Sequence, residues 1–106
     1  MELVDLVKAA TKDKASDLYL AVNAKPLMKV HGVLKEAADE VLNKDSCKEL
    51  IYKVLNESQI QEFEKCLELN CALWFDDVGR YRLNLYLQQG VIGAVLRRIE
   101  EDIPKL

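Results

Sequence analysis

Three arginines are the residues of this chain whose type and spacing best fit a binding site. Arg80 and Arg82 lie in a stretch where polar and apolar residues alternate, and Gln89-Gly90 after it is typical of a tight turn. Antiparallel pairing about that turn places Arg82 directly opposite Arg97, with Arg80 on the same face two residues away. Guanidinium groups that converge in this way form a fork for phosphate or carboxylate.

A second interpretation of the arginines is that nearby acids neutralise them. Like charges directly opposite each other in a sheet lower its stability by some tenths of a kcal/mol. Glu100 and Asp102 are the acids that could offset that cost, although the run they belong to also fits a solvated strand end. On the pattern alone neutralisation is the simpler interpretation, and the residues leave both open.

Other catalytic and metal-binding motifs are absent from the sequence. It contains no GxxxxGK[ST], GxGxxG, GxSxG or HExxH, so we expect the chain alone to be inactive as a nucleotide hydrolase, and we assign no catalytic residue. His31 is the only histidine and is expected to be structural or exposed to solvent. The three cysteines have no CxxC spacing, so we expect them to be reduced and buried, with no metal site: Cys47, Cys66 and Cys71.

Length and composition indicate one soluble globular domain over residues 1–106. Half of the residues are hydrophobic and 31% are charged, and the net charge of −3 provides no basic field for nucleic acid. No apolar run reaches the roughly 18 residues that cross a bilayer, and the first ten residues do not resemble a signal peptide. We therefore expect a cytoplasmic domain that binds no nucleic acid and does not insert into a membrane.

The order of predicted elements indicates an α+β fold. A helix over 2–12 precedes extended segments, and two further helices follow, with capping boxes predicted at Ser46–Glu49 and Ser58–Gln61. The predicted extended segments are 18–22, 27–34 with a bend at Gly32, 71–75, 80–88 and 91–99. This order favours a curved antiparallel sheet with helices packed on one face. Trp74, in the third of these segments, is expected in the core or as an interface anchor.

Four short motifs carry a resemblance to a known family. They read ASDLYL at 15–20, MKVHG at 28–32, GRYRLN at 79–84 and AVLRRI at 94–99. Their joint order resembles the N-terminal domain of PilT/PilU-type type IV pilus retraction ATPases of the secretion-ATPase superfamily, from the first helix to Ile103-Pro104. The run from Arg97 to Glu100 leans toward the PilU branch.

The resemblance implies a PAS-like fold followed in the parent protein by a RecA-like ATPase domain with the Walker loop. It also implies a homohexamer, in which ATP binds between this domain and the ATPase domain of its own or a neighbouring subunit. Mg would accompany the ATP in the full-length parent only. Arg82 and Arg97 match the family's phosphate-contacting positions, and Arg80 matches less closely. The full motor would act on the pilus platform of the inner membrane in twitching motility.

Two positions depart from the family's pattern, and two other functions stay open. Tyr19 stands where the family usually has histidine, and His31 stands where Asp or Asn is common. The first alternative is the N-terminal domain of a pilus assembly or type II secretion ATPase, which would use the same arginines. The second is a stand-alone PAS-like sensor module that binds a small ligand.

Overall fold

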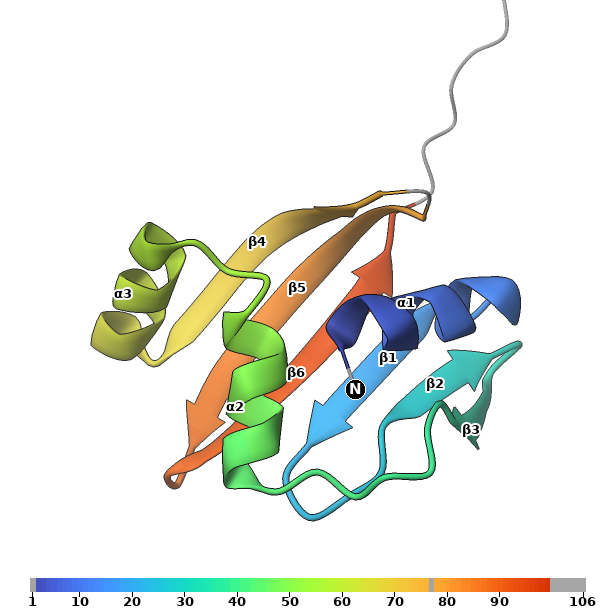
Figure 1. Cartoon of the computed structure of the whole chain (residues 1–106), viewed down its shortest axis with the longest axis horizontal. Coiled ribbons are helices and arrows are strands. Elements are labelled where there is room, and N and C mark those ends of the chain that lie inside the picture. The colour runs from blue at the N-terminus through green and yellow to red at the C-terminus, as the bar shows by residue number, and fades with distance from the viewer. Residues whose placement is uncertain (1, 77, 100–106) are drawn as a thin grey trace, which may run out of the picture.

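A six-stranded antiparallel sheet and three helices make up the part of the chain that the computed structural model describes, residues 2–76 and 78–99 (Figure 1). The α+β class and the predicted order of elements are confirmed. In chain order the elements are α1 (Leu3–Lys12), β1 (Asp17–Ala21), β2 (Leu27–Val30), β3 (Val33–Glu36), α2 (Lys44–Tyr52), α3 (Glu57–Cys66), β4 (Glu68–Phe75), β5 (Gly79–Gln88) and β6 (Val91–Arg98).

The strands lie in the order β3-β2-β1-β6-β5-β4, and every neighbouring pair is antiparallel. Two local groups of strands, β1–β3 and β4–β6, meet where β1 pairs with β6. In that pairing Asp17 faces Arg97 and Ala21 faces Gly93. The central contact of the sheet therefore joins segments from opposite ends of the chain.

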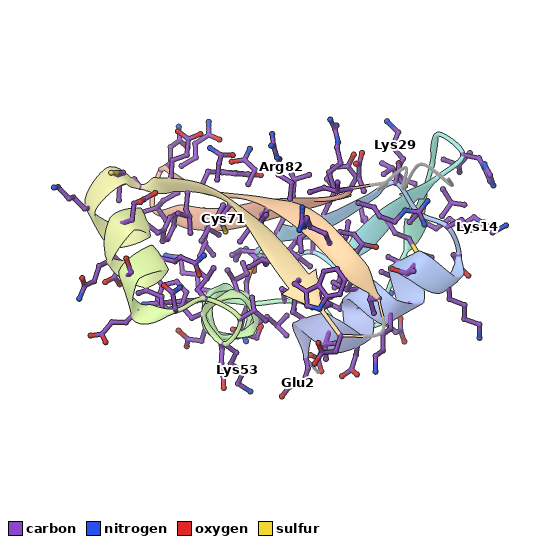
Figure 2. The ribbon with its side chains drawn as sticks, turned by 90° about the horizontal axis from the view of Figure 1, so that it is seen from above. Glu2, Lys14, Lys29, Lys53, Cys71 and Arg82 are labelled. Atoms are coloured by element: carbon purple, nitrogen blue, oxygen red, sulfur yellow. The ribbon has the colours of Figure 1, made fainter. Side chains whose placement is uncertain are left out.

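The helices pack against one face of the sheet, as predicted. In Figure 1 α1 and α2 cross in front of the strands, and α3 lies beside β4 at the sheet edge. We call the side against α1 and α2 the covered face and the other side the open face. Figure 2 shows Glu2 and Lys53 on the helix side, and Lys29 and Arg82 on the open face.

The core lies between the helices and the covered face. Apolar residues at helical spacing bury one side of α1, and alternate residues of the strands meet them. Its fully buried side chains include Leu3, Val7, Leu18, Leu20, Ile51, Tyr81, Leu83, Leu85 and Leu96. This packing fixes which face each strand residue occupies, because shifting the register by one residue would expose the whole apolar set.

The predicted capping boxes are wrong in position. Asn43 caps α2, and its side chain accepts a hydrogen bond from the Ser46 amide at 2.8 Å. Asn56 caps α3 in the same way, accepting from the Gln59 amide at 2.8 Å. Asparagine caps as well as serine, and Ser46 is here the third helical residue of the box that Asn43 begins.

Strand boundaries differ from the sequence-based ones by up to three residues. β4 begins at Glu68 because Leu67, in the left-handed conformation at φ 61°, ends α3 and turns the chain directly into the strand. The extended segment 27–34 is the hairpin β2–β3. It turns at His31 and Gly32, whose φ values of 50° and 79° fit a two-residue hairpin turn and confirm the predicted bend.

Candidate functional site

Arg82 and Arg97 face each other across β5 and β6, as predicted from the sequence. The hairpin turns at Gln89-Gly90, where φ is 53° and 76°, so both turn residues have the positive φ of a type I′ turn. Both arginines are exposed on the open face, and Figure 2 shows Arg82 pointing away from the helices. The structure therefore brings two guanidinium groups together on a surface that no element covers in the described part of the chain.

Arg80 joins them on the open face, two residues along β5. Its cross-strand partner in β4 is Trp74. Trp74 is 65% exposed, so the core position predicted for it is wrong, and its role as an interface anchor stays a prediction. Arg80 thus lies at the end of the arginine cluster, and the residue opposite it in β4 is a tryptophan and not a third cation.

Asp17 is the acid that the structure places beside the arginines. Its Oδ1 accepts from Arg97 Nε at 3.2 Å, and its Oδ2 accepts from the Tyr19 hydroxyl at 3.0 Å. Partial burial and this hydrogen bond raise the pKa of the Tyr19 hydroxyl above its usual value. Glu100 and Asp102, the acids predicted to neutralise the arginines, both lie outside the described residues.

Sequence reasoning missed Asp17 because its contact with Arg97 is made between residues 80 positions apart. The local signal was the Ser16-Asp17 pair, which marks the start of a strand. Nothing in the sequence pattern says which strand lies next to β6. Only the register of β1 against β6 brings this carboxylate to the arginine.

A row of four charged residues crosses the open face from β2 to β5. The strand pairings align Lys29 with Asp17, Asp17 with Arg97, and Arg97 with Arg82. The three cations outnumber the single carboxylate. The row therefore keeps an excess of positive charge, concentrated where the two arginines are neighbours.

A hollow of about 260 Å³ lies between the two arginines and the next row of the sheet. Asn70, Asn84 and Val95 complete its lining. The Asn84 Oδ1 atom is buried there and has no hydrogen-bond partner among the described residues. Because buried polar atoms are nearly always paired, this acceptor calls for a donor from water or a ligand. The two guanidinium groups beside this small hollow fit an anion.

Arg97 also borders a second hollow, of about 670 Å³, on the β1 side. Lys14, His31 and Arg98 contribute further basic groups there, and Asp17 and Ser16 complete the polar lining together with Gly32. His31 is exposed at its turn, which confirms the solvent-facing position expected of it. Arg97 is thus the residue that the two hollows share.

The cysteines are free and differ in their surroundings. Cys47 is fully buried, and desolvation raises the pKa of its thiol to about 11. Cys71 is half-buried with a raised pKa from the same cause, whereas Cys66 is exposed, so the expectation that all three are buried is wrong for Cys66. Within residues 2–76 and 78–99, no three His, Cys, Asp or Glu side chains gather into a metal-binding group.

In the part of the chain that the structure describes, none of the helices combines the length and the apolar composition that crossing a bilayer requires.

Two curated proteins of Pseudomonas aeruginosa are similar to the whole chain, although no family model matches it. The type IV pilus ATPase PilU is 33% identical over 106 residues, which are 100% of this chain and 28% of PilU. The type IV pilus retraction ATPase PilT is 30% identical over 103 residues, which are 97% of this chain and 30% of PilT.

Solved structures share the fold. A crystal structure of the pilus retraction motor PilT with bound ADP aligns with a TM-score of 0.90 at 28% identity, over 99% of this chain and 31% of that one. The Legionella pneumophila ATPase DotB aligns with a TM-score of 0.76 at 22% identity, over 94% of this chain and 29% of that one. The chain thus spans less than a third of the length of these relatives, and the predicted resemblance is confirmed across it.

Proposed function

We propose that this chain, which resembles the N-terminal domain of PilT/PilU-type type IV pilus ATPases, is that domain of a pilus retraction motor. In this proposal Arg82 and Arg97 bind the phosphates of ATP at the boundary with the RecA-like ATPase domain of the parent protein. Arg80 contributes from the end of the cluster. The domain itself performs no bond cleavage, because its sequence holds no Walker loop.

The pairing of Arg82 with Arg97 on the open face is the observation that carries the proposal. Like charges placed directly opposite each other destabilise a sheet, so the pair contributes nothing to folding that would explain it. The two guanidinium groups border a hollow with an unpartnered buried acceptor, Asn84 Oδ1. Phosphate oxygens suit the guanidinium groups.

The residues of the site fit the nucleotide better than its metal ion. Mg²⁺ is held chiefly by carboxylate, carbonyl and phosphate oxygens. The residues lining the hollow include no carboxylate, and the two guanidinium cations of Arg82 and Arg97 would repel a metal ion. We therefore assign the phosphates to this domain and the Mg²⁺ that accompanies ATP to the rest of the parent. There the metal would neutralise phosphate charge during transfer to water.

The mechanism of the domain is coupling. Arginines that bind phosphate strongly hold the domain against its neighbour while the nucleotide is present, and release it when the phosphate charge changes on hydrolysis. The domain would then move against its own and neighbouring ATPase domains in a homohexamer. This assembly would work in the cytoplasm on the pilus platform of the inner membrane.

The test uses the full-length motor with single substitutions. We expect Arg97→Ala and Arg82→Ala to reduce ATPase activity and to weaken ADP binding by about ten-fold or more, because each removes a charged hydrogen bond worth about 1.5–3 kcal/mol. Lys8→Ala, at an exposed lysine on α1, is the matched control. Wild-type turnover and ADP affinity in both arginine variants would refute the phosphate role.

Reading the source gene beyond the Leu106 codon tests the wider assignment. We expect a strand followed by a GxxxxGK[ST] loop within about 50 residues, as a RecA-like domain requires. A stop codon there would instead favour the stand-alone sensor. Assembly and secretion motors would also have the loop, so the gene alone does not distinguish them from a retraction motor. An Arg97→Ala strain that still assembles pili but no longer retracts them would indicate a retraction motor.

A further inference from the structure

Asp17 is the one charged side chain that is buried among the described residues. It is the first residue of β1, and its cross-strand neighbours are Lys29 on one side and Arg97 on the other. Both of its oxygens are engaged, Oδ1 by Arg97 Nε at 3.2 Å and Oδ2 by the Tyr19 hydroxyl at 3.0 Å. A buried carboxylate with two specific donors has a defined orientation, because each donor restricts its rotation.

The contact with Arg97 holds one edge of the guanidinium and leaves its far end in solvent. The side chain of Asp17 is 7% exposed, whereas that of Arg97 is 73% exposed. A bond through Nε orients the planar group near its stem, and the terminal amino groups remain available to a second anion. The geometry is that of a support behind a binding group.

Tyr19 completes the support from the same strand. Its hydroxyl donates to the oxygen of Asp17 that Arg97 does not use. A tyrosine hydroxyl is protonated at neutral pH and can therefore donate, and partial burial together with the contact to Asp17 raises its pKa further. Tyr19 lies on the open face because it is two residues after Asp17 in β1, so both side chains point the same way.

Arg82 has no such support. No carboxylate of the described residues forms an ion pair with it, and its neighbours in the hollow are Asn70, Asn84 and Arg97. The arginine pair thus consists of one guanidinium that a carboxylate holds and one that has no such contact among the described residues. An oriented group loses less freedom when it binds an anion, so the two arginines should contribute differently.

We propose that Asp17, locked by Tyr19, is a positioning residue that presents Arg97 to a phosphate group. This inference rests on the proposed function, because it supplies the means by which that site is organised in advance. Removing Asp17 leaves Arg97 in place but lets its guanidinium rotate away. Removing the Tyr19 hydroxyl loosens the carboxylate and has the same effect in weaker form.

The test follows the arginine Nε–Hε resonances of this chain by ¹⁵N–¹H NMR. Arg97→Lys identifies the Arg97 signal by its loss. We expect that signal to be shifted and slowly exchanging with solvent in the wild type, and to join the exposed arginines in Asp17→Ala. Asp17→Asn retains an oxygen acceptor and should keep part of the protection, whereas Tyr19→Phe should speed exchange about three-fold. The amide spectrum of each variant verifies its fold.

The same variants in the full-length motor report the effect on nucleotide. We expect Asp17→Ala to weaken ADP binding about ten-fold, Tyr19→Phe about three-fold, and Asp17→Asn less than Asp17→Ala. Asp39→Asn is the matched control, because it breaks an exposed ion pair with Lys25 (2.9 Å) away from the arginines. That control should leave both the Arg97 signal and the ADP affinity unchanged.

Each remaining outcome refutes a separate claim. If Arg97→Ala weakens ADP binding and Asp17→Ala does not, the positioning role is wrong and the phosphate site stands. Tighter ADP binding in Asp17→Asn would show that the carboxylate competes with phosphate, which also overturns the inference. If neither arginine variant affects ADP, the proposed function is wrong and the inference fails with it.

Discussion

On the covered face of the sheet, β5 presents Tyr81, Leu83 and Leu85, which are almost wholly buried, whereas on the open face it presents the exposed Arg80 and Arg82. One strand therefore serves two surfaces with opposite requirements. The covered residues are explained by packing, because each removes apolar area from water. The arginines are not, since the pairing of Arg82 with Arg97 costs stability. Residues that fit poorly with folding are the ones to which we assign the proposed function.

The largest expected effect comes from breaking the covered face. Leu83→Ala removes a fully buried side chain from the middle of β5 and should lower the free energy of unfolding by about 3 kcal/mol, the usual cost of such a cavity. Urea denaturation of the isolated chain measures it. Arg82→Ala, at the adjacent residue on the open face, is the matched control. An equally large decrease in the free energy of unfolding of Arg82→Ala would mean that the two faces contribute alike to stability.

The thiol of Cys47 should make the covered side sensitive to alkaline pH. Its pKa of about 11 in the folded protein is above that of an unfolded thiol, about 8.5. The stabilisation that the buried, protonated thiol provides is therefore complete below pH 8.5. It is lost as the pH rises toward 11, by about 3 kcal/mol at that pH. Urea denaturation between pH 8 and 11 should show a steeper loss in wild type than in Cys47→Ala. Parallel curves would contradict this.

On the open face the ring of Tyr86 lies closely over Gly93. A Cβ added to Gly93 would meet the ring at 2.7 Å. Gly93→Ala should therefore cost about 1–2 kcal/mol, typical of overpacking. Adding Tyr86→Leu should recover most of the loss, and a double-mutant cycle in urea measures the coupling. Additive losses would show that the ring moves aside freely.

The helix caps contribute on a smaller scale. Asn56→Ala should lower the free energy of unfolding by about 1 kcal/mol, because it leaves the Gln59 amide without its capping partner. Ser58→Ala is the control, because Ser58 is an exposed residue inside α3 and not its cap. Thermal unfolding of both variants separates the two positions. A larger loss in Ser58→Ala would restore the sequence-based assignment.

The smallest effect should have the opposite sign. Arg82→Ala relieves the repulsion from Arg97 and should stabilise the isolated chain by a few tenths of a kcal/mol, about 0.2–0.5. Salt at about 0.5 M screens exposed charges and should abolish the gain. Thermal unfolding at low and high salt measures it, with Lys8→Ala as the control. Destabilisation at low salt would mean that Arg82 supports the fold.

Local features of the fold were predictable from the sequence, and long-range ones were not. The alternation in β5 and the Gln89-Gly90 turn predicted that Arg82 faces Arg97, because a hairpin register depends only on the turn and on residues near it. The caps were predicted two and three residues too late, because serine and asparagine satisfy the same amides. For Trp74 the sequence left core and interface anchor open, and the structure excludes the core, because hydrophobicity alone does not say which face of an edge strand is covered.

The sequence by itself determined the α+β class, the order of the elements and the two opposed arginines, since each follows from periodicity or from one short turn. The tertiary structure decided that β1 lies next to β6, which brings the Asp17 carboxylate to Arg97 and the Tyr19 hydroxyl to Asp17. The physical reason is that pairing between distant strands depends on how their apolar faces share one core. No local pattern in either strand records that choice.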